Sequence, residues 1–209
     1  MAQRFYELLF TPAVRALQER FGSRDAYRRY EAPDAPPRDR LTERETAFIA
    51  ARDSFYLASV SAAGWPYLQH RGGPAGFLRA LDERTLGFAD FRGNRQYLSA
   101  GNLAGDDRVA LFLMDYPNRR RLKILGRARI VEPDDDPALM GRLEIGGYRA
   151  RVERGILIRI EAFDWNCSQH ITPRYSEAEL RPVFEELQLR IARLEQENAR
   201  LAAAEPRSR

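Results

Sequence analysis

The sequence contains one cysteine, two histidines and no long apolar run. A single cysteine, Cys167, cannot form an internal disulfide and is typical of a reducing compartment, so we expect a cytoplasmic protein. The few histidines and cysteines do not provide a metal centre with three or four convergent ligands. No apolar stretch reaches the length of about 18 residues that a membrane-spanning helix needs. The first residues also lack the unbroken apolar core of a signal peptide.

Neither sign of charge dominates the chain, which has 34 basic and 30 acidic residues and a net charge of +4. Arginines scattered among acids serve a small anionic ligand as well as a polyanion, so this balance does not indicate nucleic-acid binding. A GxGxxG turn after a strand and a P-loop are both missing, which argues against a Rossmann or P-loop nucleotide site. The length of 209 residues fits one domain with appendages, or at most two small domains, and hydrophobic residues make up 44% of the chain, which is enough for a core.

Two helix starts are readable near the N-terminus. Thr11 followed by Pro12 combines an N-cap residue with the residue favoured at the first helical position. Thr42 and Glu45 have the spacing of a capping box for a second helix. Between these helices, the charged, proline-rich segment 31–40 is expected to be a linker.

Short apolar strands separated by turns fill the middle of the chain. We expect strands at 55–61, 67–71, 77–79, 85–89, 109–115, 121–131 and 155–163, and helices at 98–104 and 137–145. Short strands with frequent turns favour an antiparallel barrel over a parallel sheet with crossover helices. The predicted fold is therefore mostly β with flanking helices. Its parts are an N-terminal helical extension and linker (1–40), a barrel domain (41–175) and a C-terminal helix (176–209).

One polar turn stands out between the strand at 85–89 and the helix at 98–104. It carries Arg92, Asn94, Arg95 and Gln96 around Gly93. Two guanidiniums beside the free N–H groups of a helix start favour an anion, most naturally a phosphate. A solvated basic loop is the alternative interpretation.

Four segments in order carry a family resemblance: QHRGG (69–73), FRGNRQ (91–96), RRRLKILGRA (119–128) and WNCSQHI (165–171). Together they resemble the pyridoxamine 5′-phosphate oxidase-like family of FMN-binding split barrels, in particular its bacterial branch with QHRGG and WNCxQHI motifs. The resemblance covers roughly residues 40–175. It implies an antiparallel split barrel, FMN as cofactor, and a homodimer in which both subunits build each flavin site. It also implies two-electron transfer with a small molecule as donor or acceptor.

The resemblance and the polar turn together assign ten residues to the cofactor: Gln69, Arg71, Asn94, Arg95, Gln96, Arg121, Lys123, Trp165, Gln169 and Arg174. Arg95 matches the arginine of the family's phosphate turn. Gln96 stands where the family usually has a lysine, so Arg71 and Lys123 are candidate suppliers of the missing charge. Solvated surface positions for these two residues, and a core position for Trp165, remain as alternatives.

Several positions depart from the family pattern. Gln69 replaces an arginine, and Arg121 replaces a glutamine that contacts the cofactor. Asp90 stands near a cofactor-contacting position, where it would repel a phosphate or instead cap the following helix. The family's substrate-contacting lysine aligns with Pro74, and its C-terminal arginine–histidine substrate motif is not reproduced.

The resemblance therefore supports the cofactor more than any substrate, and no catalytic residue is assigned. We interpret the chain as an FMN-binding oxidoreductase acting on an unidentified small molecule. The alternative is a non-catalytic flavin- or heme-binding or interaction module. A nucleophilic Cys167 assisted by His170 is disfavoured because the sequence supplies no orienting group or oxyanion motif.

The C-terminal segment follows a heptad pattern. Leu180, Leu187, Leu194 and Leu201 recur every seven residues, with Phe184, Ile191 and Asn198 at the other core position. One asparagine among aliphatic residues at this position is typical of parallel two-stranded coiled coils. The pattern predicts such a coiled coil; a single helix packed on its own barrel is the alternative.

Overall fold

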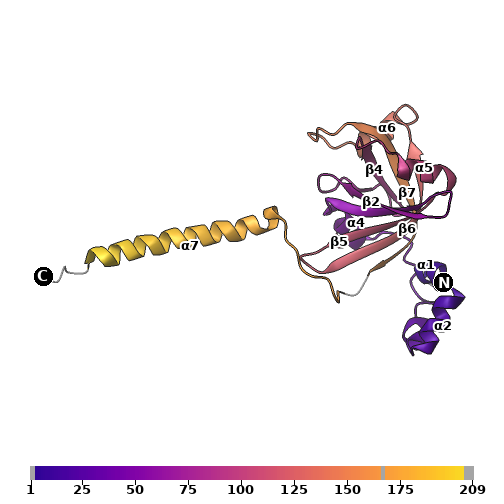
Figure 1. The fold of residues 1–209 in the computed structure, drawn as a ribbon, viewed down its shortest axis with the longest axis horizontal. Coiled ribbons are helices and arrows are strands. Elements are labelled where there is room, and N and C mark those ends of the chain that lie inside the picture. Colours follow the sequence, from indigo (N-terminus) through magenta and orange to yellow (C-terminus); the bar gives the residue numbers. More distant parts are fainter. Residues whose placement is uncertain (1–2, 166–167, 205–209) are drawn as a thin grey trace.

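The structure, a computed structural model, describes residues 3–165 and 168–204. Within these residues, seven strands form one antiparallel sheet that curls into an open barrel. Short helices flank the barrel, and a long helix leads away from it (Figure 1). The predicted fold class, a split β-barrel with flanking helices and a long C-terminal helix, is confirmed.

The elements follow the predicted order closely. The strands are β1 (Ser54–Val60), β2 (Pro66–Gly72), β3 (Arg79–Ala80), β4 (Thr85–Phe91), β5 (Arg108–Asp115), β6 (Arg120–Val131) and β7 (Val152–Trp165). The helices are α1 (Arg4–Leu9), α2 (Pro12–Arg20), α3 (Arg24–Arg28), α4 (Glu43–Ala50), α5 (Leu98–Gly105), α6 (Pro137–Leu143) and α7 (Glu177–Ala204). The strand expected at 77–79 is wrong in its bounds, because Phe77 packs its ring into the core and only Arg79–Ala80 pair with β4.

The strand order is β2-β1-β5-β6-β7-β4-β3, with antiparallel pairing at every step. Along β5, residues alternate between fully buried and half-buried, as expected for a strand with one face on the core. The longest ladder, between β6 and β7, has a bulge opposite Leu125 and Gly126, where Glu161 of β7 is left unpaired. A Cβ at Gly126 would approach the carbonyl oxygen of Arg159 to 2.7 Å, so the bend between these strands needs glycine.

Both predicted helix starts are confirmed. The Thr11 hydroxyl accepts a hydrogen bond from the backbone N–H of Val14, and Pro12 occupies the first turn of α2. Thr42 and Glu45 form the predicted capping box of α4, in which the Thr42 N–H donates to Glu45 Oε2 at 3.0 Å. The segment 31–40 contains neither helix nor strand, as predicted for a linker.

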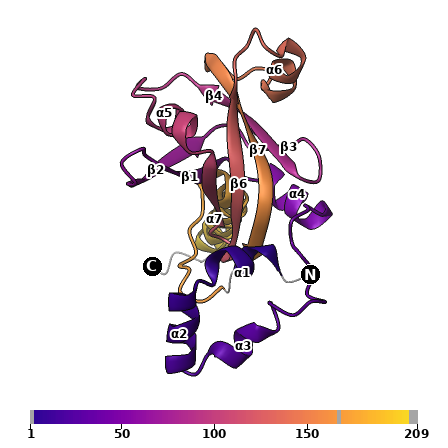
Figure 2. The ribbon, with the colours of Figure 1, turned by 90° about the vertical axis from the view of Figure 1, so that its right-hand side faces the viewer.

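A buried carboxylate, Asp164 on β7, attaches the N-terminal extension to the barrel. It accepts hydrogen bonds from Tyr6 Oη of α1 and from Arg38 Nη1 of the linker, both at 3.1 Å. The ammonium of Lys123 on β6 lies 3.1 Å from its other oxygen. Burial and the neighbouring Asp164 carboxylate raise the pKa of the Tyr6 phenol. Figure 2 shows α1 against the ends of β6 and β7, with α2 and α3 beyond it.

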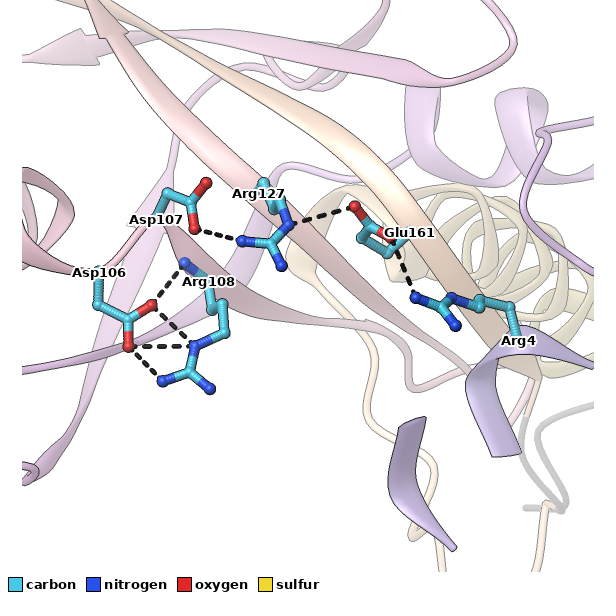
Figure 3. Close-up of polar contacts among 6 residues, drawn as sticks. All are labelled: Arg4, Asp106, Asp107, Arg108, Arg127 and Glu161. Carbon is cyan, nitrogen blue, oxygen red and sulfur yellow. Dashed lines mark hydrogen bonds and ion pairs between the residues drawn. The ribbon is translucent and has the colours of Figure 1, made fainter. Parts of the chain in front are cut away.

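A second, exposed chain of ion pairs supports the same attachment (Figure 3). Arg4 of α1 lies 4.0 Å from Glu161 on β7, and Arg127 on β6 lies 3.3 Å from the same carboxylate. Arg127 also reaches Asp107 at 2.7 Å. Such surface pairs typically contribute only about 0–1 kcal/mol each, so the buried carboxylate Asp164 is the stronger link.

Helix α7 extends into solvent away from the barrel (Figure 1). Every described side chain from Arg181 to Ala203 is exposed. The alternative of a single helix packed on its own barrel is therefore wrong for this chain. No helix in the described part of the chain has both the length and the apolar character to cross a membrane.

Candidate functional site

A pocket of about 280 Å³ opens between β2 and β4. Its remaining walls are residues 93–97 of the polar turn and the first turn of α5. In the strand order, β2 is one end of the sheet and β4 lies next to the other end, so among the described residues no backbone ladder joins them. The pocket therefore occupies the split of the barrel.

Five of the ten predicted cofactor residues line this pocket: Gln69, Arg71, Asn94, Arg95 and Gln96. They come from β2 and from the polar turn. The structure thus brings together two segments that the sequence separates by more than twenty residues. Phe77, Phe88 and Phe91 add an apolar wall.

The polar turn is held in an unusual backbone conformation. Arg95 and Tyr97 have φ angles of 61° and 56°, in the left-handed region that residues with a Cβ rarely adopt. The Asn94 side chain accepts a hydrogen bond from the Gln96 N–H at 3.2 Å, which fixes the turn between them. Arg95 Nε donates to Tyr97 Oη at 3.0 Å. This hydrogen bond uses only Nε, so the two terminal nitrogens of the exposed Arg95 guanidinium remain available to a ligand.

Helix α5 begins at the pocket without a side-chain cap. Its N-cap residue, Tyr97, makes no capping hydrogen bond, and Leu98, Ser99 and Ala100 of the first turn line the pocket. The first N–H groups of a helix have no partner within the helix and carry a partial positive charge. The predicted combination of a helix start and an arginine side chain is therefore present.

Asp90 on β4 is enclosed by two guanidiniums. Arg71 Nη1 lies 2.5 Å from Asp90 Oδ1, across the split, and Arg154 Nε lies 3.8 Å from Asp90 Oδ2. The helix-cap interpretation of Asp90 is wrong, because Tyr97 is the N-cap of α5. A solvated surface position for Arg71 is also wrong, because its side chain is mostly buried.

A second group of charges surrounds Tyr97. Its hydroxyl lies 3.4 Å from Glu153 Oε1, and the guanidinium of Arg154 stacks over its ring at 5.0 Å. Arg92 Nε lies 3.7 Å from the same Glu153 carboxylate. Four arginines, at positions 71, 92, 95 and 154, thus surround two carboxylates, and the excess charge is positive. This electrostatic balance favours an anionic ligand.

The sequence matches the profile of a family described as pyridoxamine 5′-phosphate oxidase over residues 41–155, more than half of the chain. The chain belongs to this family. No curated protein matches the sequence.

Several solved structures are similar to this member of the pyridoxamine 5′-phosphate oxidase family. One is HupZ of Group A Streptococcus, which is 14% identical in sequence and has a TM-score of 0.46. The match covers 65% of this chain and 99% of the HupZ chain. General stress protein 26 of Bacillus anthracis has 15% identity, coverage of 57% and 88%, and a TM-score of 0.45. HutZ, the heme storage protein of Vibrio cholerae, has 17% identity, coverage of 60% and 94%, and a TM-score of 0.41. All three lie below 25% identity and a TM-score of 0.5, so the family assignment rests on the sequence match.

The other five predicted residues of this family member lie away from its pocket. Lys123 is held by Asp164, and its ammonium lies over the ring of Phe5 at 4.9 Å. Trp165 Nε1 donates to Glu45 at 2.6 Å. The Trp165 ring also packs edge-on against a core phenylalanine of α4, so the core position left open for this tryptophan is the one observed.

Arg121 and Arg174 stack on aromatic rings, over Phe112 at 5.7 Å and over Tyr116 at 5.1 Å. Gln169 is exposed on the loop after β7. Asn166 and Cys167 of the WNCSQHI motif lie outside the described residues. No group of His, Cys, Asp and Glu that could hold a metal occurs within the ranges 3–165 and 168–204.

Phe112, Tyr116 and Lys123 share a second, apolar groove of about 540 Å³ on the outer face of the barrel. Tyr56 on β1 and Leu68 on β2 complete its exposed rim. Three of the predicted cofactor residues, at positions 121, 123 and 174, therefore border this groove or stack on its aromatic lining.

Sequence reasoning missed two residues that line the pocket of this family member, Tyr97 and Glu153, and also Arg154, which packs on the Tyr97 ring. None belongs to a motif that the sequence analysis used. Arg154 pairs with Asp90 only because β7 and β4 are neighbours in register. The signal that could have found it was the strand pairing, because Arg154 and Asp90 lie 64 positions apart in the sequence.

Proposed function

We propose that the chain is a cytoplasmic, homodimeric flavoprotein that binds FMN in the pocket between β2 and β4 and acts as an oxidoreductase on a small molecule. One observation carries the proposal: the Arg95 guanidinium, the uncapped start of α5 and the mostly buried Arg71 converge on one pocket with excess positive charge. Bound FMN would supply the two-electron chemistry, and the protein would orient the flavin and tune it.

The donors and walls of the pocket fit the parts of FMN. Arg71 Nε and Arg154 Nε are buried and have no hydrogen-bond acceptor in the described part of the chain, so both could donate a hydrogen bond to a ligand. The phosphate would bind Arg95 and the N–H groups of α5. Asn94 and Gln69 offer hydrogen bonds to the ribityl chain, and the phenylalanine wall offers an apolar surface to the ring.

The homodimer in this proposal uses the apolar groove. An exposed groove lined by aromatic and aliphatic residues is typical of an interface. The resemblance implies that each flavin site is built from both subunits. A second copy seated on this groove would cover Arg121, Lys123 and Arg174, whose positions away from their own pocket agree with contacts across such an interface.

Cofactor extraction tests the proposal directly. We expect denaturation of the purified protein to release FMN, with FAD and heme absent or minor. Protein purified without flavin is titrated with FMN, riboflavin and hemin, and should take up FMN most tightly. A folded, colourless protein that takes up no flavin contradicts the proposal. Preferential uptake of hemin would support the heme-binding alternative.

Reduction separates an oxidoreductase from a binding module. We expect the flavin absorbance of the loaded protein to bleach when a nicotinamide reductant is added under anaerobic conditions, and to return with oxygen. A flavin that stays oxidised with every nicotinamide reductant, yet bleaches with dithionite, would favour the non-catalytic alternative.

The Tyr97→Phe substitution tests how Arg95 is held. It removes only the hydroxyl, which accepts from Arg95 Nε and lies 3.4 Å from Glu153 Oε1, so the Arg95 guanidinium loses its orientation but keeps its charge. We expect FMN affinity to fall about two- to tenfold, in line with the loss of one partly exposed hydrogen bond, and riboflavin affinity to stay unchanged. Fluorescence titration of both ligands measures the ratio.

Tyr148→Phe is the matched control for this substitution. The Tyr148 ring packs against Phe91 at 5.1 Å beside the pocket, and its hydroxyl makes no hydrogen bond within the described residues. This variant should bind both ligands as the unmodified protein does. If Tyr97→Phe leaves the ratio of FMN to riboflavin affinity unchanged, Tyr97 does not position Arg95.

A further inference from the structure

We infer that α7 forms a parallel, two-stranded coiled coil with α7 of a second copy of the chain. This inference does not depend on the flavin. The heptad pattern came from the sequence alone. The structure shows in addition that α7 is one helix of 28 residues and that its apolar side chains are exposed to solvent. Figure 1 shows the whole helix projecting away from the barrel.

The residues at the two core positions of the heptads form an apolar stripe along α7, the seam, which no other part of the described chain covers. Phe184, Leu187, Ile191 and Leu194 are between 48% and 54% exposed. An isolated helix is marginal in water, and most helical stability in proteins comes from packing of an apolar face. A helix of this length, about 42 Å, therefore needs a partner along its seam.

The residue types on the seam fix the kind of partner. Leucine at d together with Ile191 at a favours two strands over three or four. In a parallel pair each layer meets its own copy, so Asn198 at a faces Asn198 and the two amides hydrogen-bond to each other. In an antiparallel pair, a positions face d positions, and Asn198 would be buried against leucine without a partner.

Charges beside the seam agree with a parallel, in-register pair. Arg190 lies at a g position and Glu195 at the following e position. In parallel two-stranded coils, g of one helix lies beside the following e of the other, so each pair of helices gains this contact twice. The opposite face of the helix is mostly charged, and Leu189, at f, is the large apolar residue that lies well off the seam at 74% exposure.

Disulfide trapping tests the register. In a Cys167→Ser background, we compare Asn198→Cys and Leu194→Cys on the seam with Leu189→Cys on the outer face, each in the full chain. We expect both seam variants to form disulfide-linked dimers on mild oxidation at least ten times faster than Leu189→Cys. Antiparallel helices place at most one layer opposite itself, so linking at only one seam position overturns the parallel arrangement. Equal rates at all three positions overturn the coiled coil.

Truncation after Arg181 gives a second measurement that does not rely on cysteine. This variant keeps the barrel and the described pocket and removes the seam. We expect it to unfold at a lower temperature and its dimer to dissociate on dilution at a concentration at least tenfold higher than for the full chain. Identical dilution profiles contradict the proposal. Flavin content measured on the same samples reports separately on the proposed function, which fails only if the full chain also lacks flavin.

Discussion

Replacing Arg95 with alanine will weaken FMN binding about ten- to a hundredfold and leave riboflavin binding almost unchanged. The reason is that a hydrogen bond between ionised groups contributes about 1.5–3 kcal/mol, and riboflavin lacks the phosphate that would receive it. The exposed guanidinium of Arg95 has two free terminal nitrogens beside the start of α5. The other guanidinium of the turn, that of Arg92, faces Glu153 and does not replace this charge. Fluorescence titration of both ligands measures the effect.

Arg92→Ala is the matched control, because it removes the same charge three residues away. Arg92 does not line the pocket, and its guanidinium faces Glu153 at 3.7 Å. We expect Arg92→Ala to change FMN affinity less than about threefold, as for a distant, screened charge. If Arg95→Ala weakens FMN and riboflavin equally, Arg95 shapes the turn and does not bind phosphate.

The Asp164→Asn substitution should have the largest effect on stability, lowering the free energy of unfolding by about 2–4 kcal/mol. The Asp164 side chain is only 7% exposed and binds Tyr6, Arg38 and Lys123. Removing its charge leaves two cations without a counter-ion. Because both cations are about one-third exposed, water offsets part of the loss, and we place the effect below that of a fully buried pair. Urea unfolding followed by circular dichroism measures it.

Asp106→Asn is the control for this measurement. Asp106 pairs with Arg108 on the surface, as Figure 3 shows, and this pairing lowers the pKa of Asp106 to about 2. Because this pair lies at the surface, we expect a much smaller change in the unfolding midpoint than for Asp164→Asn. Limited proteolysis should cut within residues 3–40 much faster in Asp164→Asn than in Asp106→Asn. Equal cleavage rates would show that Asp164 does not anchor the N-terminal extension.

The sequence predicts the elements of this fold well where local chemistry decides them. The N-cap at Thr11, the capping box at Thr42 and the strand at 109–115 depend on neighbours within a few residues, and the structure confirms all three. The short helices α1 and α3 were missed. Their contacts are aromatic rings from distant segments, such as Tyr6 stacked on Tyr30 at 4.8 Å, and no local pattern predicts such packing.

The candidate site also has one part that depends on neighbouring residues in the sequence and another that depends on contacts between distant strands. The turn with Asn94, Arg95 and Gln96 is contiguous in sequence and could be recognised as one unit. The partner of Asp90 could not, because Arg71 and Arg154 reach it from two other strands. Lys123 was named as a charge supplier for the phosphate, but in this chain its ammonium is already paired with Asp164.

The ion pair between Arg71 and Asp90 has a mechanical consequence. Four of the strand pairs, β1–β2, β4–β7, β5–β6 and β6–β7, are joined by long ladders of backbone hydrogen bonds, which must break together for the strands to part. Across the split between β2 and β4, side chains make the connection, and one guanidinium–carboxylate contact can open and reform by rotation about a few bonds. The barrel is therefore stiff around most of its circumference and easier to deform at the split between β2 and β4. Rotation of the Arg71 side chain would release both of its contacts with β4, to Asp90 and to the Phe88 ring at 5.8 Å, while the backbone ladders of the sheet stay intact.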